Sequence, residues 1–311
     1  MSHHWGYMSA LLAAMLFGIG NVISKILLND LHPLLVAGLI YLVSGVFLVA
    51  IRIQSPMKLN SFYGFLGLEY RKFPTLGLRD FKILLGMVFF GAFLAPYIFL
   101  YGLQLTTAIN ASFLSITENI FTILLASLLL GERLREKEVL SVSVILLGAV
   151  FLVTNLEFYS LKLAERLFGN LLVLVGCFLW SVDNVLSRLL SVEGDVIEVA
   201  GFKSLIGGLT IVVLCMLLGV PFNLNLVQIV LLVFVGLFSI GFSLVFYFAA
   251  LHYIGAGKTS TIYATSAVFG AFFAVLILQE KFTFVQAFSG IMMLAGVYAL
   301  YKMGLDESRL P

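Results

Sequence analysis

Long apolar stretches separated by short polar connections run through the whole chain. A helix needs roughly 20 apolar residues to cross the hydrocarbon layer of a membrane. Ten segments meet that requirement: residues 6–28, 33–53, 81–104, 107–130, 138–155, 169–190, 197–219, 226–251, 257–279 and 284–302. The pattern therefore predicts an all-α integral membrane protein with ten transmembrane helices.

The composition supports the same class. The chain is 61% hydrophobic and 11% charged, whereas soluble domains average about half apolar and a quarter charged residues. The stretch GAGKTST at 255–261 resembles the end of a phosphate-binding loop, but it lacks the first glycine of that pattern and joins two apolar spans. We therefore expect no cofactor, no metal and no nucleic-acid partner. The expected surroundings are a lipid bilayer, and the expected assembly is a monomer or a homodimer.

The distribution of basic residues predicts the orientation. Of 18 Lys and Arg residues, an orientation with a cytoplasmic N-terminus puts only Lys25, Lys162, Arg166 and Lys281 outside, and Lys203 lies within a span. The others fall on the inner side, where membrane proteins concentrate positive charge. The sequence thus predicts a multi-pass protein of the plasma membrane with both termini in the cytoplasm, in agreement with an even number of spans.

One connection is much longer than the others. Residues 54–80 mix aromatic and basic side chains. This mixture is typical of a segment that lies at the membrane interface, and an ordinary solvated loop explains it equally well.

The sequence contains two related halves. LFGIGNVISKILL at 16–28 aligns with LWSVDNVLSRLLS at 179–191, so that Asn21 corresponds to Asn184. SLLLGERL at 127–134 aligns in the same way with AVLILQEKF at 274–282. We divide the chain into a first repeat, 1–156, and a second repeat, 157–311. Each repeat has five spans, an odd number, so the second repeat enters the membrane in the opposite orientation. Such inverted repeats place a substrate site at their interface.

These features resemble the EamA type of the drug/metabolite transporter superfamily. The resemblance covers almost the whole chain and is carried by the ten spans, the repeat, LFGIGNVISKIL and LLLGERL. The long segment 54–80 and Gln279 in place of Gly131 depart from an exact repeat. The resemblance implies a secondary transporter that exports small metabolites such as amino acids by alternating access around a central cavity. An uncoupled facilitator or exchanger of small anionic metabolites is the alternative.

Other membrane functions fit the sequence less well. An enzyme would need paired histidines and carboxylates on neighbouring spans, but the four histidines are scattered. A channel would show rings of charges or repeated selectivity segments, and neither is present in the sequence. We therefore expect a transporter rather than an enzyme.

Three charged residues lie well inside predicted spans: Glu118, Asp183 and Lys203. Such residues generally face protein or water and mark transport pathways. Asp183 and Lys203 each lie about seven residues, or roughly 10 Å, from the inner ends of consecutive antiparallel spans. They can therefore meet, either as a structural ion pair or as a pair that opens to release Asp183 to a proton or Lys203 to a substrate carboxylate.

Glu118 has no basic residue at its own depth in this topology. A carboxyl group without a cationic partner in a low-dielectric site favours its neutral form, which is the behaviour of a proton carrier. We expect Glu118 to couple transport to protons, with Asp183 as the second candidate. A hydrogen bond between helices is the alternative role for Glu118.

The remaining candidates for substrate binding come from helical spacing and from the repeat. Together with Glu118 and Lys203 they are Asn21, Tyr97, Tyr101, Trp180, Asn184, Tyr263 and Ser266. The two asparagines can bind a substrate amine or carboxylate, or stabilise helix packing. Ser266 is the repeat equivalent of Glu118. Trp180 and Tyr263 can form apolar walls or simply pack, and Pro96 is expected to kink its span because it cannot donate a backbone hydrogen bond.

Overall fold

The computed structural model describes residues 2–53, 77–130, 136–154, 161–189 and 196–307. Within these ranges the regular elements are all helical. They are α1 (Ser2–Leu27), α2 (Pro33–Ile53), α4 (Leu78–Met87), η1 (Val88–Leu94), α5 (Ala95–Leu105), α6 (Ala108–Leu114), α7 (Thr117–Leu130), α8 (Glu136–Thr154), α9 (Leu161–Leu189), α10 (Val196–Leu217), α11 (Leu226–Phe234), η2 (Val235–Phe242), α12 (Ser243–Tyr263), α13 (Ser266–Leu278) and α14 (Phe284–Glu307). Nine helical segments of the described chain are long and apolar enough to span a membrane, and α8 contains a shorter apolar helix. The predicted all-α fold with a ten-helix arrangement is confirmed.

The span predicted at 81–104 consists of α4, η1 and α5 joined end to end. Pro96 lies in the first turn of α5, directly after the π-helical turns of η1. The second repeat has the same arrangement in α11, η2 and α12, but Leu244 occupies the position of the proline. The π-helical turns therefore belong to the repeated fold and do not require proline. Residues 54–76 lie outside the described residues, and Leu78–Asp80 begin α4.

The two repeats pack around a local two-fold relationship, seen most clearly where α2 crosses α10. Gly45 approaches Leu205, and its repeat equivalent Gly208 approaches Leu42, the equivalent of Leu205. A Cβ atom added to Gly208 would come 2.7 Å from the Cα atom of Leu42, so this crossing needs glycine. Small residues of this kind let transmembrane helices approach closely.

The same crossing shows that the repeats are inverted. Gly38, near the start of α2, contacts Ile211 near the end of α10, while Gly201 near the start of α10 contacts Leu48 near the end of α2. The two equivalent helices therefore run antiparallel. In α8 and α14, Gly148 against Met293 corresponds to Gly296 against Ile145, so the relationship extends to the last helix of each repeat.

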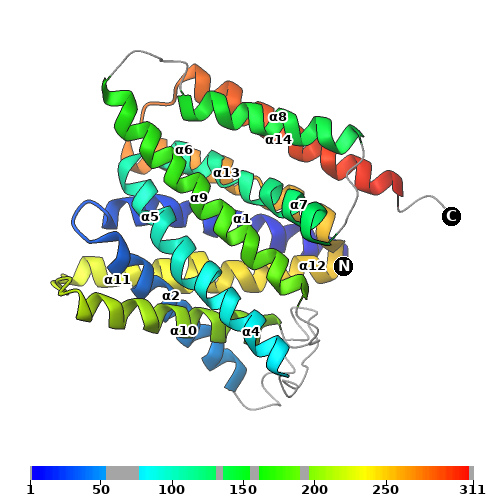
Figure 1. Ribbon diagram of the computed structural model, residues 1–311. Helices are drawn as coiled ribbons and strands as arrows, with labels where there is room; N and C mark the ends of the chain where they lie inside the picture. Colours follow the sequence, from blue (N-terminus) through cyan, green and yellow to red (C-terminus); the bar gives the residue numbers. More distant parts are fainter. Residues whose placement is uncertain (1, 54–76, 131–135, 155–160, 190–195, 308–311) are drawn as a thin grey trace.

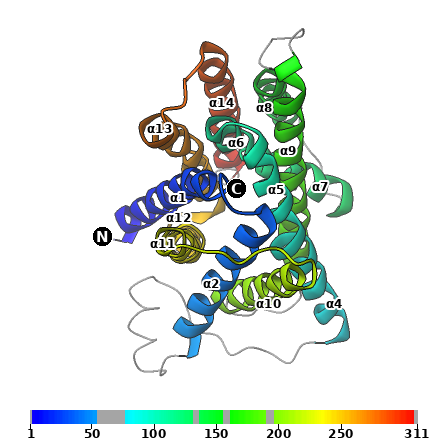
Figure 2. The ribbon, with the colours of Figure 1, turned by 90° about the vertical axis from the view of Figure 1, so that its left-hand side faces the viewer.

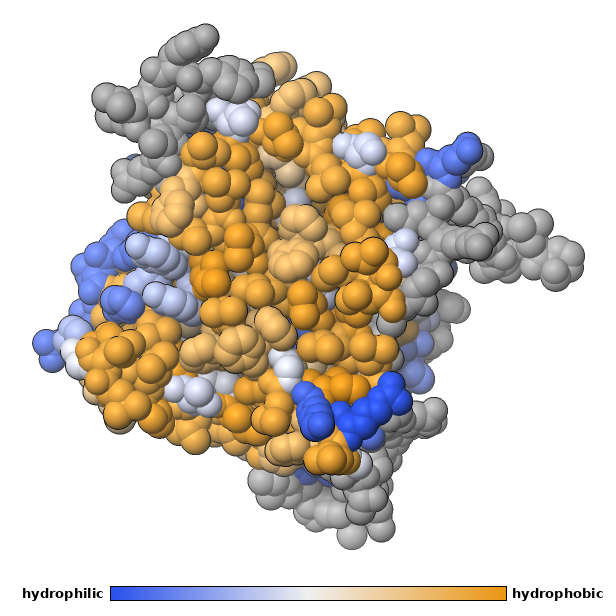
Figure 3. All heavy atoms as spheres, in the orientation of Figure 1, coloured by the Kyte–Doolittle hydropathy of each residue, from blue (hydrophilic) through white to orange (hydrophobic). Residues whose placement is uncertain are grey.

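The helices lie side by side along the long direction of the bundle, and the start of α1 and the end of α14 lie at the same end (Figure 1). Viewed from the side, α1 lies between α12 and the α5–α6 region (Figure 2). Apolar side chains cover most of the face shown in Figure 3, with hydrophilic residues toward its edges. This surface is suited to contact with lipid tails. The division at residue 156 stays a prediction, because 155–160 lie outside the described residues.

Candidate functional site

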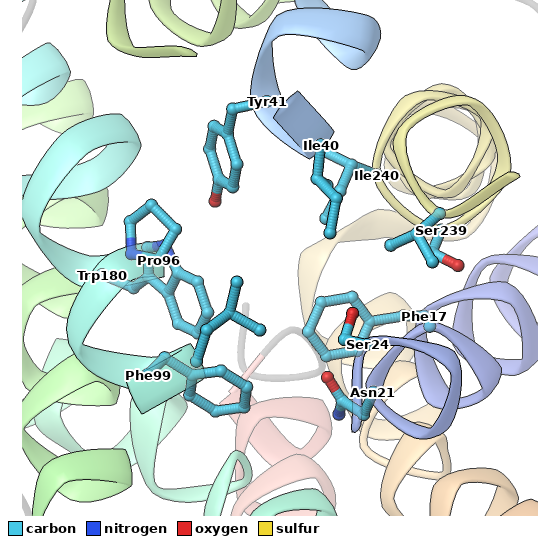
Figure 4. A pocket seen from close by; sticks show the side chains of 13 residues that line it. Phe17, Asn21, Ser24, Ile40, Tyr41, Pro96, Phe99, Trp180, Ser239 and Ile240 are labelled. Atoms are coloured by element: carbon cyan, nitrogen blue, oxygen red, sulfur yellow. The ribbon is translucent and has the colours of Figure 1, made fainter. Parts of the chain in front are cut away.

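A cavity lies between the two repeats, at the meeting of α1, α2, α5, α9 and η2 (Figure 4). Its empty space is about 410 Å³, including the part that opens to the surroundings. The lining residues are Phe17, Gly20, Asn21, Ser24, Ile40, Tyr41, Pro96, Phe99, Leu100, Trp180, Val235, Ser239 and Ile240. No charged residue is among them. The wall is thus apolar and aromatic, with a few neutral polar groups.

Two predicted site residues, Asn21 and Trp180, form part of this wall, together with Tyr41, which was not predicted. The Tyr41 hydroxyl and the Asn21 side chain point toward the open space in Figure 4, and Asn21 is only 7% exposed. Trp180 packs its ring against Phe99, with centroids 4.9 Å apart. Its indole Nε1–H donates a hydrogen bond to the Gly91 carbonyl, at 3.0 Å, which fixes the orientation of the ring.

The structure brings Asp183 and Lys203 together, as the sequence predicts. Lys203 Nζ lies 2.5 Å from Asp183 Oδ2, and the two side chains are 20% and 6% exposed. The other carboxylate oxygen of Asp183, Oδ1, is buried without a hydrogen-bond partner among the described residues. Asp183 lies directly against the backbone of Gly91. A buried charge is costly unless it is paired, and Lys203 supplies that pairing.

Glu118 is held by a neutral partner. The Asn184 side-chain amide on α9 donates to Glu118 Oε1, at 2.9 Å, and the same amide lies 3.4 Å from the Thr122 hydroxyl. Glu118 is partly accessible, and its carboxyl group lies within electrostatic range of Asp183 and Lys203. Three of the predicted site residues, Glu118 on α7, Asp183 on α9 and Lys203 on α10, therefore lie within electrostatic range of one another.

A break in the helix positions Glu118. The sequence pattern did not predict this break. The span predicted at 107–130 is divided into α6 and α7, and Glu118 lies in the first turn of α7. The Thr117 hydroxyl bonds to the Leu114 carbonyl at 2.6 Å. In the second repeat Thr265 bonds to Ile262 at the same distance, between α12 and α13. Threonine at the equivalent positions 117 and 265 is the feature of the sequence that indicates the breaks. A threonine hydroxyl that bonds to a backbone carbonyl competes with the helical hydrogen bonds and bends the helix.

Tyr263 and Ser266 lie at this second break. The Tyr263 ring is 5.6 Å from the ring of Phe17, which lines the cavity, and 4.9 Å from that of Tyr247. Ser266 is buried, and its backbone carbonyl faces Gly18 on α1. Tyr263 thus packs against one residue of the cavity wall, Phe17, and Ser266 occupies the position that Glu118 has in the first repeat.

Tyr97 and Tyr101, both predicted to bind substrate, are not among the residues that line the cavity. Tyr101 is 38% exposed on the outside of the bundle and stacks on Tyr97, with ring centroids 6.3 Å apart. The cavity face of α5 carries Pro96, Phe99 and Leu100 instead. Almost every position of this helix is apolar or aromatic, so its periodicity cannot distinguish the cavity face from the lipid face.

The cavity and the ion pair occupy equivalent places in the two repeats. Gly20 corresponds to Asp183, and Gly20 packs against Ser239 just as Asp183 packs against Gly91. Ile40 lies where the second repeat has Lys203. Both Gly20 and Ile40 line the cavity. One copy of the repeated site therefore holds the charges, and the other leaves room between apolar walls.

A second polar cluster lies at the end of the bundle opposite the chain termini. Lys25 Nζ donates to the carbonyl oxygens of Leu103, Gln104 and Thr106, at 2.7, 2.8 and 2.6 Å, at the end of α5. The Glu280 carboxylate accepts from the backbone N–H groups of Ala108 and Ile109 at the start of α6. A cation at a helix C-terminus and an anion at a helix N-terminus are both favourable. The sequence predicts only that Lys25 lies on the outer side of the membrane.

The described residues contain no group of three or more His, Cys, Asp or Glu side chains that could hold a metal ion. What the arrangement offers is a neutral cavity beside an ion pair and a hydrogen-bonded carboxyl group. These features permit binding, charge movement and proton exchange.

Comparison with known proteins places this arrangement in context. The profile of the EamA-like transporter family matches the chain twice, over residues 4–154 and 167–302. A protein of Methanothermobacter thermautotrophicus, named uncharacterized transporter, is 36% identical over 98% of this chain and 88% of its own length. A probable amino-acid metabolite efflux pump of Escherichia coli is 26% identical over 58% of this chain and 52% of its own. A solved structure titled only as the crystal structure of a protein has a TM-score of 0.62 at 18% identity, covering 97% of this chain and 96% of that one.

Proposed function

Because the chain belongs to the EamA-like transporter family, we propose that it is a secondary transporter that exports a small metabolite, such as an amino acid, by alternating access around the cavity. The inverted repeats support this proposal, since they give two similar gates that face opposite sides of the membrane. The name of the Escherichia coli relative supports amino-acid metabolites as the first substrates to test. The apolar, aromatic wall suits a substrate with an apolar body and few polar groups.

The proposed coupling residue is Glu118, with Asp183 as the second candidate. One observation carries this assignment: the Glu118 carboxyl group bonds to a neutral amide, that of Asn184, whereas Asp183 is neutralised by Lys203. Glu118 therefore gains or loses a charge without breaking an ion pair of its own among the described residues. Glu118 lies in the first turn of α7, directly after the break between α6 and α7, so its charge would change beside an interruption of the helix.

Proton binding at Glu118 would act through the conformational equilibrium. A ligand shifts such an equilibrium only when it binds the two conformations with different affinity. The charged carboxylate accepts from the Asn184 amide, while the neutral acid also carries a donor, so the two forms favour different partners. Binding of the proton then changes the affinity for the substrate, and binding of the substrate changes the affinity for the proton, because both shift the same conformational equilibrium.

The test is transport into proteoliposomes of radiolabelled amino acids and their derivatives, with and without an imposed pH difference. Glu118→Gln keeps the shape and hydrogen bonding of the side chain and removes the titration. We expect the variant to exchange substrate passively but not to accumulate it against a gradient. Glu136→Gln is the matched control, because Glu136 is exposed in the first turn of α8. If Glu118→Gln responds to the pH difference as the parent does, Glu118 is not the coupling site, and Asp183→Asn is tested next.

A second function is an uncoupled facilitator or exchanger of small anionic metabolites. The observation in its favour is Lys203, whose side chain keeps 20% of its surface exposed despite the ion pair. A substrate carboxylate or phosphate could then replace Asp183 as its partner. Transport that continues undiminished in the presence of an uncoupler would favour this function over proton coupling.

Both functions require a lipid bilayer and a small-molecule substrate. The proposed location is the plasma membrane with both termini in the cytoplasm, and a monomer or homodimer is the proposed assembly. The arrangement of α1 and α14 supports the topology, because their terminal ends lie at one end of the bundle.

A further inference from the structure

We infer that Gly91 is a positioning residue that links the wall of the cavity to the Asp183–Lys203 pair. The inference rests on the proposed function, because it concerns how an occupied cavity influences the charged site. Gly91 lies in the π-helical turns of η1 and faces α9. It contacts Trp180 with its carbonyl group and Asp183 with its Cα side.

The absence of a side chain at Gly91 makes the space that Asp183 occupies. A Cβ atom at this position would lie 2.8 Å from the Cβ atom of Asp183 and would overlap its carboxylate. Carbon atoms do not approach so closely without displacement of one group. Asp183 would have to leave its present position, and with it the contact that Oδ2 makes with Lys203.

The backbone of the same residue holds the cavity wall. The Gly91 carbonyl accepts the hydrogen bond of the Trp180 indole, and the Trp180 side chain lines the cavity. Trp180 and Asp183 are three residues apart on α9, so they lie on neighbouring positions of one helix face. A substrate that moves the indole ring therefore acts on the peptide group that also confines the Asp183 carboxylate.

The location of Gly91 in η1 gives this contact a means of changing. π-helical turns are uncommon and often occur at functional sites. In the second repeat the corresponding residue is Ser239 in η2, which packs against Gly20. Each copy of the contact thus pairs one glycine with one residue that has a side chain, but only the Gly91 copy contains a charge.

The first test replaces Gly91 by alanine and measures substrate counterflow and pH-driven accumulation in proteoliposomes. Displacing Asp183 should lower pH-driven accumulation by about tenfold, the effect expected from losing one contact of moderate strength. Gly86→Ala is the matched control in the same span, because its Cβ atom would meet only the flexible end of Leu186 at 3.0 Å. Gly86→Ala should transport as the parent does.

The second test separates positioning from folding. Gly91→Ser combined with Asp183→Gly and Lys203→Ile rebuilds the packing that Ser239, Gly20 and Ile40 have in the other repeat, and it leaves no lysine without its partner. This triple variant should recover the yield and melting temperature lost in Gly91→Ser, but it should not recover pH-driven accumulation. A yield and melting temperature no higher than those of Gly91→Ser would overturn the proposed packing relationship.

The third test breaks the hydrogen bond that links Gly91 to the cavity wall. Trp180→Phe keeps an aromatic wall and loses the hydrogen bond to Gly91. It should fold normally and show reduced counterflow, with an effect that is not additive with that of Gly91→Ala. Additive effects, or Gly91→Ala transport equal to the parent, would overturn the inference. The parent's own response to the pH difference tests proton coupling separately, and counterflow requires no proton gradient.

Discussion

Asp183 and Lys203 form an ion pair between consecutive antiparallel helices, with 2.5 Å between Oδ2 and Nζ. The pair lies in the place where the first repeat has Gly20 and Ile40 beside an open cavity. The charged site therefore differs from its apolar repeat equivalent, although the surrounding glycine contacts between helices are shared. This asymmetry supports distinct roles for the two copies.

Removing one member of this pair should be worse than removing both. A single substitution leaves a buried charge alone and costs roughly 3–5 kcal/mol, whereas an apolar replacement of the whole pair is often tolerated. We expect Asp183→Asn and Lys203→Met each to lower the melting temperature in detergent more than the double variant does. If the loss of melting temperature in the double variant equals the sum of the two single losses, the two side chains do not stabilise each other.

Asn21 and Tyr101 should differ sharply in their effect on transport. Asn21 lines the cavity, whereas Tyr101 lies on the outside of α5. Asn21→Leu removes a polar group from the cavity at nearly constant size and should raise KM roughly 5- to 150-fold, corresponding to about 1–3 kcal/mol. Tyr101→Leu should leave KM within about twofold of the parent, since lone surface changes are usually small. Equal KM values for the two variants would show that the cavity does not bind the substrate.

The span pattern was predictable because membrane helices follow a simple rule of length and apolarity. The segment predicted at 33–53 coincides with α2, and that predicted at 284–302 lies within α14. The contact between Asp183 and Lys203 was also within reach of the sequence. Both residues are placed by depth along consecutive helices, and helix rise alone sets that depth.

The rest of the site depends on which face of each helix points inward and on where the helices are interrupted. The depth of a residue in the membrane determines neither. The helix that carries Tyr101 is apolar all round, and such a helix gives no sign of the face that points inward. The partner of Glu118 is an amide on α9 rather than a charge, so a search for opposite charges could not find it. The role proposed for Gly91 could not be predicted, because it rests on the space that glycine leaves for Asp183, and the sequence does not show which residue fills that space.

The glycine crossing of α2 and α10 gives a prediction about symmetry. Gly45→Ala and Gly208→Ala introduce the same overlap at equivalent positions, each against a leucine of the other helix. Both should lower the melting temperature, and by similar amounts, because overpacking typically costs about 1–3 kcal/mol. Gly257→Ala is the control, since its Cβ atom would make an ordinary 3.6 Å contact with Tyr301. A large loss at only one of the two crossing glycines would contradict the local two-fold relationship.

Lys25 should stabilise the end of the bundle opposite the termini. Its ammonium group bonds to three carbonyl oxygens at the end of α5, and a hydrogen bond to a charged group contributes about 1.5–3 kcal/mol. Lys25→Met should therefore lower the unfolding free energy in detergent by at least that amount. Lys302→Met removes an exposed lysine of α14 and serves as the control. Equal stability of the two variants would show that the carbonyl groups find other partners at no cost.

The proposed orientation predicts which side of the membrane is accessible to a reagent. Asn29 is exposed between α1 and α2, at the end opposite the termini, and Lys302 is exposed near the end of α14. A cysteine at position 29 should react with an impermeant thiol reagent added to intact cells, and one at position 302 should react only after the cells are opened. The native Cys177 and Cys215 are both buried, so they should contribute little background. Labelling of position 302 in intact cells would reverse the topology and place the Asp183–Lys203 end of the bundle outside, because Lys203 lies near the same end as the termini. The positive charges of the inner connections would then oppose the usual distribution.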